Sequence, residues 1–219
     1  MKIALVKTPS VAKKMFPNYT WDIETNRKEI FLTFDDGPTP EITDWTLNTL
    51  KDFNAKATFF CIGENILKYP DIFQNILNEG HAIGNHTQHH LKGWRTTTKD
   101  YIQDVEATQM IINKRHKNHP IQCKLFRPPY GRIKPKQAKQ LMALGFQIVM
   151  WDVLSFDWNQ AISEKTCLEN VISKSKEGSI VVFHDSIKAK KNMAYALPKV
   201  LEHFTSKGFE FKTLQSSMA

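Results

Sequence analysis

The sequence predicts an α/β fold in which parallel strands alternate with helices and curl into a closed or nearly closed, TIM-barrel-like barrel. Short apolar runs alternate with longer amphipathic stretches along the chain, which is typical of a β/α architecture. Several runs, such as Ile180–Phe183, are apolar on both faces, as in strands buried within a parallel sheet. The length of 219 residues suits a barrel better than an open sheet, although periodicity alone does not separate the two.

Seven strands are expected, each on a short apolar run. They cover Glu29–Phe34, Ala57–Ile62, Ala82–Asn85, Leu125–Arg127, Gln147–Trp151, Ile180–His184 and Phe209–Leu214. A further run, Trp21–Ile23, precedes the first strand and is separated from it by the polar segment Glu24–Lys28. These segments could form a hairpin that closes the bottom of the barrel.

Six helices are expected between the strands. Thr39 followed by Pro40 predicts the start of the first, which runs to Asn54, because proline suits the first helical position. The others cover Tyr69–Glu79, Thr98–Asn113, Lys134–Leu144, Glu164–Lys176 and Met193–Lys207. No linker, repeat or low-complexity tract divides the chain, so we expect one domain over residues 1–219, with a motif-bearing core over about 29–214.

Composition excludes several classes of protein. Hydrophobic residues make up 41% and charged residues 24% of the chain, which argues against disorder. The longest apolar runs are too short to span a membrane, and Lys7 interrupts the only apolar run near the start, so no signal peptide is expected. Three cysteines without paired spacing are expected to be reduced thiols. These features together predict a cytoplasmic protein, with export by an unrecognised route as the alternative.

The net charge of +8 could attract nucleic acid, anionic lipid or an acidic polymer. Basic clusters occur at Lys114–Lys117, Lys134–Lys136 and Lys188–Lys191. None is interleaved with aromatic residues, as a groove for single-stranded nucleic acid would be. We therefore expect these clusters to be solvated faces, and we expect no nucleic-acid partner.

Polar and ionisable residues gather where the predicted strands end. The segments are Thr33–Pro38, Asn85–His90, Arg127–Gly131, Trp151–Trp158 and Phe183–Asp185. In a parallel barrel the carboxyl ends of the strands face one common mouth, where enzyme sites lie. Five separate segments would then deliver carboxylates, imidazoles and a guanidinium to one place.

Each segment alone also has an ordinary structural explanation. Asp35–Pro38 is a common turn sequence, and Arg127–Gly131 could be only a rigid connection. His86 and His90 would present both rings to one side of a helix, for one metal ion or as a surface cluster. His184 after an apolar strand could be a buried, hydrogen-bonded histidine. Their joint occurrence favours a site, because two imidazoles, one carboxylate and an open water position form a catalytic zinc centre.

Five short motifs, in this order, resemble those of the polysaccharide deacetylases, that is, carbohydrate esterase family 4 or the NodB-homology domain. They are Thr33–Pro38, His86–His90, Arg127–Gly131, Asp157-Trp158 and Val182–His184. The resemblance spans about residues 30–214. It implies a distorted (β/α) barrel of about seven parallel strands. It also implies an enzyme that removes N-acetyl, sometimes O-acetyl, groups from sugar polymers with one divalent metal ion.

The resemblance implies a role for each matched residue. Asp35 matches the general base, and Arg127 matches the residue that pairs with it and keeps it ionised. His184 matches the general acid, and Asp157 the partner that orients and charges that histidine. Metal ligands are implied at three positions: Asp36, His86 and His90. Zn²⁺ suits such a set best, although Co²⁺, Ni²⁺ or Mn²⁺ would also be accepted.

Four further residues are expected at the substrate: Pro129, Tyr130, Leu154 and Trp158. Tyr130 matches the position whose backbone N–H helps to stabilise the oxyanion, and Trp158 matches a wall of the acetyl pocket. The fourth motif usually reads Asp-x-x-Asp-Trp, but Leu154 replaces its first aspartate. That replacement makes one edge of the mouth more apolar, and it bears on the choice of substrate more than on the chemistry.

The expected function is therefore a metal-dependent hydrolase that removes N-acetyl or O-acetyl groups from a carbohydrate such as chitin oligosaccharide or peptidoglycan-type N-acetylglucosamine. One alternative is a non-catalytic sugar-binding module on the same fold. A pure binder needs neither Arg127 nor the Asp157–His184 pair, so the complete set of residues argues against it. The other alternative, suggested only by the charge, is a basic nucleic-acid binder.

Overall fold

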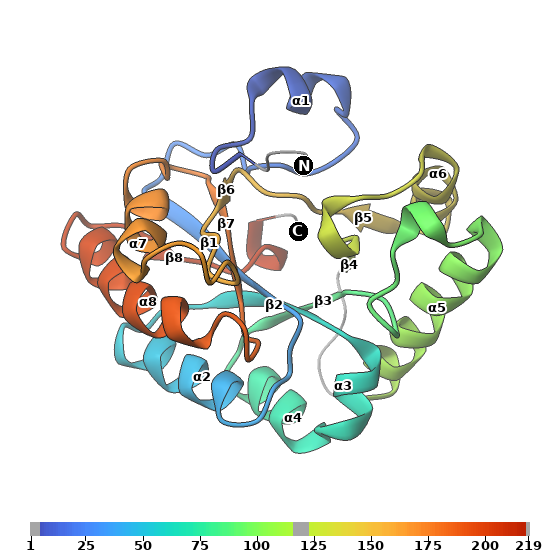
Figure 1. The fold of residues 1–219 in the computed structure, drawn as a ribbon, viewed down its shortest axis with the longest axis horizontal. Helices are drawn as coiled ribbons and strands as arrows, with labels where there is room; N and C mark the ends of the chain where they lie inside the picture. The colour runs from blue at the N-terminus through green and yellow to red at the C-terminus, as the bar shows by residue number, and fades with distance from the viewer. Residues whose placement is uncertain (1–4, 116–122, 218–219) are drawn as a thin grey trace.

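A curled half-barrel of parallel strands forms the centre of the computed structural model, which describes residues 5–115 and 123–217 (Figure 1). Seven strands lie in the order β5-β4-β3-β2-β1-β7-β6. Their bounds are β1 Glu29–Asp35, β2 Ala57–Cys61, β3 Ala82–Asn85, β4 Lys124–Phe126, β5 Phe146–Ile148, β6 Val153–Leu154 and β7 Ile180–His184. A short strand, β8 (Glu210–Phe211), pairs with the start of β1. All of these pairings are parallel, as predicted.

Every predicted strand is present, with ends that differ by a few residues. The strand missed by the sequence analysis is β6, which has only two residues and therefore no measurable alternation. β4 ends at Phe126, so Arg127 lies just beyond the strand rather than in it. Register places the ends of neighbouring strands side by side, with Asp35 of β1 opposite Phe60 on one side and His184 on the other.

The N-terminal segment joins the two edges of the half-barrel. The Thr20 N–H donates to the Ile148 carbonyl of β5 at 2.9 Å, and the Leu154 N–H of β6 donates to the Val6 carbonyl at 2.8 Å. The expected hairpin with β1 is wrong. Asp22 instead forms an antiparallel bridge with Ser179, and the Ile23 N–H donates to the Gly178 carbonyl, since this segment lies beside the approach to β7.

Helices surround the strands, and the short helix α1 lies apart from the others over the N-terminal segment (Figure 1). The helices are α1 Ser10–Met15, α2 Ile42–Asp52, α3 Gly63–Lys68, α4 Pro70–Asn78, α5 Thr98–Arg115, α6 Pro135–Ala143, α7 Glu164–Ile172 and α8 Lys190–Thr205. Short 3₁₀ turns occur at η1 Gly93–Arg95, η2 Pro129–Gly131 and η3 Gln215–Ser217. The sequence analysis missed α1 and α3, each of six residues, because so short a helix has little periodicity.

Helix α2 begins later than predicted. Thr39 and Pro40 lie in a turn before it, and the Thr39 N–H donates to the Thr43 hydroxyl at 2.7 Å. The predicted glycines after α4 and α6 do adopt positive φ, 76° at Gly80 and 82° at Gly145, as a helix end requires. α7 ends at Ile172, well before Gly178.

Side chains of the strands alternate between the inside of the half-barrel and the surrounding helices. On β1, Leu32 and Phe34 belong to the large core shared with the helices, where Phe34 stacks between Phe59 and Phe183. Phe31 belongs instead to a smaller inner cluster with Phe60. Asp35 follows Phe31 with the same parity, so the strand pattern places its carboxylate on the inner side, at the carboxyl end.

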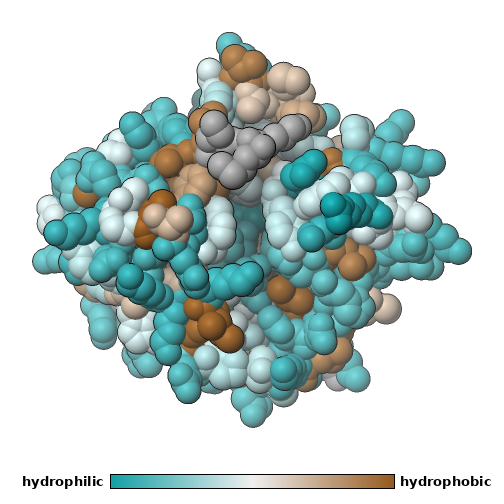
Figure 2. All heavy atoms as spheres, viewed as in Figure 1, coloured by the Kyte–Doolittle hydropathy of each residue, from teal (hydrophilic) through white to brown (hydrophobic). Residues whose placement is uncertain are grey.

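The surface around the half-barrel is mostly hydrophilic and is hollowed near the centre of the face in Figure 2.

Three further expectations from the sequence concern single features. The cysteines Cys61, Cys123 and Cys167 are free, as predicted. None of the helices in residues 5–115 and 123–217 has the length and hydropathy of a membrane span. The basic cluster Lys114–Lys117 extends past residue 115 and falls partly outside the described residues.

Candidate active site

A cavity of about 660 Å³ opens where the central strands end. Its lining includes most of the residues that the sequence analysis assigned to the site: Asp35, Asp36, His86, His90, Tyr130, Leu154, Trp158 and His184. They lie at the carboxyl ends of β1, β6 and β7 or in the segments that follow β1, β3, β4 and β6. The carboxyl ends of parallel strands thus bring five distant parts of the chain together, as expected for this architecture.

The Asp35 carboxylate is paired with a buried arginine. Arg127 is fully buried, and its Nη1 donates to Asp35 Oδ1 at 2.7 Å and to the Thr33 hydroxyl at 2.7 Å. Its Nη2 donates to the Met150 carbonyl, and its guanidinium lies over the Phe60 ring. Burial alone would raise the pKa of Asp35, but the charge and hydrogen bond of Arg127, together with the nearby His86 and His184, outweigh burial and lower that pKa. Asp35 is therefore an ionised, buried carboxylate that can accept a proton.

Asp36 points into the same cavity because the backbone turns sharply at this residue. Its φ is 81°, in the left-handed region, and the Asn65 side chain donates to its carbonyl at 2.8 Å. The next residue, Gly37, donates its N–H to Asp185 Oδ1 at 3.0 Å, and a Cβ there would lie 2.0 Å from Asp185 Oδ2. The turn therefore requires glycine, and it brings two adjacent carboxylates to one side.

Asp36, His86 and His90 form a compact set of donor atoms. One oxygen or nitrogen from each lies within 4.8 Å of the others, and Asp36 Oδ1 is 3.6 Å from His86 Nε2 and 3.3 Å from His90 Nε2. The His86 Nδ1 lies 2.8 Å from the Arg127 carbonyl, so Nδ1 carries the proton and Nε2 turns its lone pair toward Asp36. Burial lowers the pKa of His86, and lowers that of His90 to about 4, which keeps both rings neutral. The set fits a divalent cation.

The two histidines do not lie on a helix, contrary to the geometry that their spacing suggested. They flank a loop in which Thr87 has φ 66° and His90 has φ 52°. His81 and His89 point elsewhere, as expected. His81 accepts the Ala57 N–H at 3.1 Å, and the His89 side chain is 60% exposed.

His184 at the end of β7 is held by a buried aspartate. Its Nδ1 lies 2.8 Å from Asp157 Oδ1, and its backbone N–H donates to Asp157 Oδ2 at 2.6 Å. Burial alone would lower the pKa of His184, but the Asp157 carboxylate outweighs it and raises that pKa to about 9. The Trp158 ring lies 4.7 Å from the His184 ring, and it stacks on Phe156. His184 is thus a protonated imidazole near neutral pH, with Nε2 left to act.

The expected substrate residues occupy different positions around the cavity. Tyr130 is 52% exposed at the rim, with φ 61° and its ring 4.7 Å from that of His90. Leu154 on β6 and Trp158 line the wall. Pro129 is buried in η2 and is not among the residues that line the cavity.

Three supporting residues received no role from the sequence. Asp185 also accepts the Thr43 hydroxyl at 2.5 Å, and burial raises its pKa to about 7. Asn192 of α8 donates to the Asp157 carbonyl, and Asp104 of α5 accepts from the loop between the two histidines. Of the three, only Asp185 could have been predicted from the sequence to lie near the site, because it directly follows His184. The other two lie in helices where no pattern distinguishes them from solvated residues.

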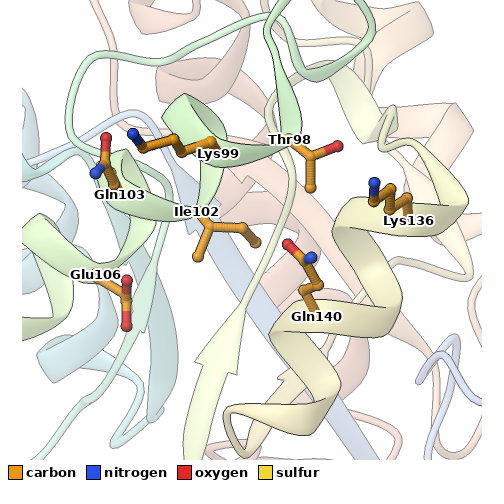
Figure 3. Close-up of a pocket in the computed structure, with 7 residues that line it drawn as sticks. All are labelled: Thr98, Lys99, Ile102, Gln103, Glu106, Lys136 and Gln140. Atoms are coloured by element: carbon orange, nitrogen blue, oxygen red, sulfur yellow. The ribbon is translucent and has the colours of Figure 1, made fainter.

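A second, shallower hollow of about 400 Å³ lies between α5 and α6 (Figure 3). Its lining comes from Thr98, Lys99, Ile102, Gln103, Glu106, Lys136 and Gln140. It shares no residue with the first cavity, and it contains a single carboxylate and no histidine. It therefore offers no group for acid–base chemistry comparable to that of the first cavity.

Comparison with known proteins agrees with this geometry. Residues 22–149 match the family model described as polysaccharide deacetylase. A peptidoglycan-N-acetylglucosamine deacetylase of Bacillus cereus is 38% identical over 199 residues, which cover 90% of this chain and 71% of that protein. Chitin deacetylase 2 of Saccharomyces cerevisiae is 35% identical over 175 residues, covering 77% and 54%. The crystal structure of the Bc1960 peptidoglycan N-acetylglucosamine deacetylase superposes with a TM-score of 0.86 at 36% identity, covering 96% of each chain.

Proposed function

Because the chain belongs to the polysaccharide deacetylase family, we propose that it hydrolyses the acetamide of an N-acetylated glycan in the cavity formed by Asp35, Asp36, His86, His90 and His184. The family and the relatives named as deacetylases together support a carbohydrate deacetylase. The observation that carries the assignment of the chemistry is the pairing of two opposite groups across one cavity: an ionised carboxylate beside Arg127 and a protonated imidazole beside Asp157.

The relatives favour a glycan that contains N-acetylglucosamine. Two of them are named for peptidoglycan N-acetylglucosamine, and one for chitin. We take the N-acetyl group of such a sugar as the substrate, with an O-acetyl ester as the second choice. The whole of residues 1–219 would serve as one catalytic domain.

Asp36, His86 and His90 would hold one divalent cation, with Zn²⁺ as our choice for two imidazoles and a carboxylate. When bound, such an ion lowers the pKa of a water molecule and polarises the acetyl carbonyl. The chain supplies neutral imidazoles for it, because burial lowers the pKa of both histidines.

The residues of the chain would divide the proton transfers. Asp35 would accept a proton from the attacking water, and Arg127 would keep the carboxylate ionised and oriented. His184 would donate from Nε2 to the departing nitrogen, since Asp157 holds its Nδ1. The Tyr130 N–H would stabilise the oxyanion. Leu154 and Trp158 would exclude water from the acetyl group.

Metal content and acetate release test the proposal together. The purified chain should carry about one divalent ion, because one three-donor set is present among the described residues. Chelation should abolish acetate release from N-acetylglucosamine oligomers, and added Zn²⁺ or Co²⁺ should restore it. Full activity in metal-free protein would overturn the mechanism.

The non-catalytic alternative predicts a different result in the same experiment. A sugar-binding module would bind the oligomers, for example by calorimetry, without releasing acetate at any metal concentration. Acetate release by the wild type that is lost in His184→Ala would exclude it. The substrate screen should include chitin oligomers, peptidoglycan fragments and an O-acetylated xylan, so that the three classes are ranked directly.

A further inference from the structure

The loop that carries the two histidine ligands holds an unfavourable backbone conformation. Thr87 and His90 both have left-handed φ values, 66° and 52°. For residues other than glycine, asparagine and aspartate this conformation is unfavourable, because the Cβ crowds the following carbonyl oxygen. Hydrogen bonds must therefore stabilise this conformation. Two lie within the segment, from the Thr87 N–H to Asn85 Oδ1 at 2.9 Å and from the Leu91 N–H to the Thr87 hydroxyl at 3.2 Å, and the neighbouring helices add others.

The loop is clamped between two helices through its peptide groups. On one side, the Gly63 and Glu64 N–H groups at the start of α3 donate to the Thr87 and Gln88 carbonyls at 3.0 and 3.1 Å. On the other side lies Asp104 of α5, which is 8% exposed. The Thr87 and Gln88 carbonyls thus face α3, and the Gln88 and His89 N–H groups face α5.

Asp104 makes three contacts with the loop through one carboxylate. Its Oδ2 accepts the Gln88 N–H at 2.8 Å and the His89 N–H at 3.2 Å, and its Oδ1 lies 2.5 Å from His89 Nδ1. In the described part of the chain, no lysine or arginine lies within 4 Å of it. Hydrogen bonds to a charged acceptor are roughly twice as strong as neutral ones. All the hydrogen bonds that the Asp104 carboxylate makes in the described part of the chain therefore go to the loop.

Other contacts from α5 to this region are neutral. The Asn85 side chain donates to the Val105 carbonyl at 2.8 Å, and the Thr108 hydroxyl donates to Gln88 Oε1 at 3.1 Å. Asp104 is the charged member of this group, and it alone contacts two successive N–H groups between the ligands.

We propose that Asp104 is a positioning residue for the cation site, and that its carboxylate holds the Gln88-His89 peptides so that His86 and His90 converge on Asp36. Asp104 does not reach the cavity and takes no part in the chemistry. The inference rests on the proposed function only in that the three donors bind a divalent cation. Replacing this carboxylate should let the loop relax, so that the donor atoms separate and cation affinity falls.

Cation affinity, measured without substrate, tests the proposal. The probes are Zn²⁺ in competition with a chromophoric chelator and the visible spectrum of bound Co²⁺. Asp104→Asn should weaken Zn²⁺ binding by about 10–100-fold and alter the Co²⁺ spectrum. At saturating Zn²⁺ its KM for an N-acetylglucosamine oligomer should match that of the wild type. Asp104→Glu should restore part of the affinity.

Two further variants separate positioning from general stability. Asp100 is an exposed residue of the same helix, and its side chain accepts only the Thr97 hydroxyl. The control variant Asp100→Asn should therefore leave Zn²⁺ affinity unchanged. His89→Ala removes one of the three contacts from an exposed residue, and it should weaken binding by about 2–5-fold.

The proposal is overturned if folded Asp104→Asn binds Zn²⁺ within threefold of the wild type, whatever its melting temperature. If Asp104→Asn does not fold, His89→Ala decides instead, and unchanged Zn²⁺ affinity in that variant is the contrary result. Failure of the proposed function would look different: wild-type protein would bind Zn²⁺ and release no acetate.

Discussion

Adjacent aspartates can have two different tasks here because the backbone turns between them. Along an extended strand, neighbouring side chains point to opposite faces. Asp35 follows the inward pattern of β1, and the left-handed φ of Asp36 turns the second carboxylate into the same cavity. One carboxylate then lies against Arg127 and the other against two imidazoles.

The two aspartates should therefore give different phenotypes. Asp35→Asn should retain the metal ion and bind substrate, but lose about 10²–10⁴-fold in rate, since an amide cannot accept the proton. Asp36→Asn should weaken metal affinity, because a neutral amide is a poorer ligand for a dication. Bound metal and acetate release, measured for both variants, check this. Reversed phenotypes would exchange the two roles, and two active variants would refute both.

His81 should make the protein sensitive to mild acid. Burial lowers its pKa to about 4, whereas an unfolded histidine titrates near 6.5. Protons therefore bind the unfolded chain more tightly, so this residue's contribution is complete above about pH 6.5 and is lost as the pH falls toward 4. His81→Gln should shrink the difference in unfolding free energy between pH 7.5 and pH 5 by about 2 kcal/mol. Urea titrations at both pH values measure it. An unchanged difference in His81→Gln would contradict the assignment.

At the scale of elements, the ends of the strands and the loops after them build the site. The parallel strands set the direction of the chain at their ends. The loops that follow then turn side chains into the cavity at residues with positive φ: Asp36, His90 and Tyr130. Helices stabilise these loops from behind: α3 and α5 hold the histidine loop, and Asn192 of α8 holds Asp157. The shortest strand, β6, contributes Leu154 to the cavity wall.

Leu154→Asp should change substrate preference and leave the metal in place. The family's fourth motif usually carries an aspartate at this position, and leucine removes an acceptor for sugar hydroxyls. We expect altered relative rates of acetate release among chitin oligomers, peptidoglycan fragments and acetylated xylan, with unchanged Zn²⁺ content. Leu154→Asn serves as the control for polarity without charge. Loss of metal from Leu154→Asp would mean that the match to the fourth motif is wrong.

At the scale of the whole molecule, the half-barrel depends on its N-terminal segment. Asp152 is fully buried between β5 and β6, and it accepts the Ser179 hydroxyl at 2.6 Å. Lys7 and Lys13 of the N-terminal segment reach the same carboxylate at 2.5 and 2.6 Å. The buried Asp152 carboxylate thus links the N-terminal segment to the edge of the sheet at β6.

Asp152→Asn should lower the free energy of unfolding by roughly 1–3 kcal/mol, because hydrogen bonds to a charged acceptor are lost. Burial would raise the pKa of Asp152, but the lysines and Ser179 outweigh it and lower that pKa. The stabilisation is therefore present above about pH 4 and is lost as the pH falls below it. Urea unfolding at pH 7 measures the effect. Asp22 is half-exposed, so Asp22→Asn should lower the free energy of unfolding much less. An equal loss of stability in the two variants would refute the special role of the buried Asp152 carboxylate.

Much of the fold was predictable because its signals are local. Strands such as Ile180–His184 and Ala82–Asn85 were predicted to the residue, since a run apolar on both faces occurs where a strand is buried on both sides. β6 and α3 were missed because a two-residue strand and a six-residue helix have no period of their own. The pairing of Asp22 with Ser179 depends on residues more than 150 positions apart, which no local pattern encodes.

The sequence by itself determined the fold class, the family and most of the residues that line the cavity, because the architecture brings short motifs at the ends of parallel strands to one place. Only the tertiary structure decided how those residues are held. The turn at Asp36, the non-helical loop between His86 and His90, and the contacts from Asp104 to that loop depend on backbone angles and on packing between distant helices. Those features arise from the sum of many weak contacts, which leave no pattern in a single stretch of sequence.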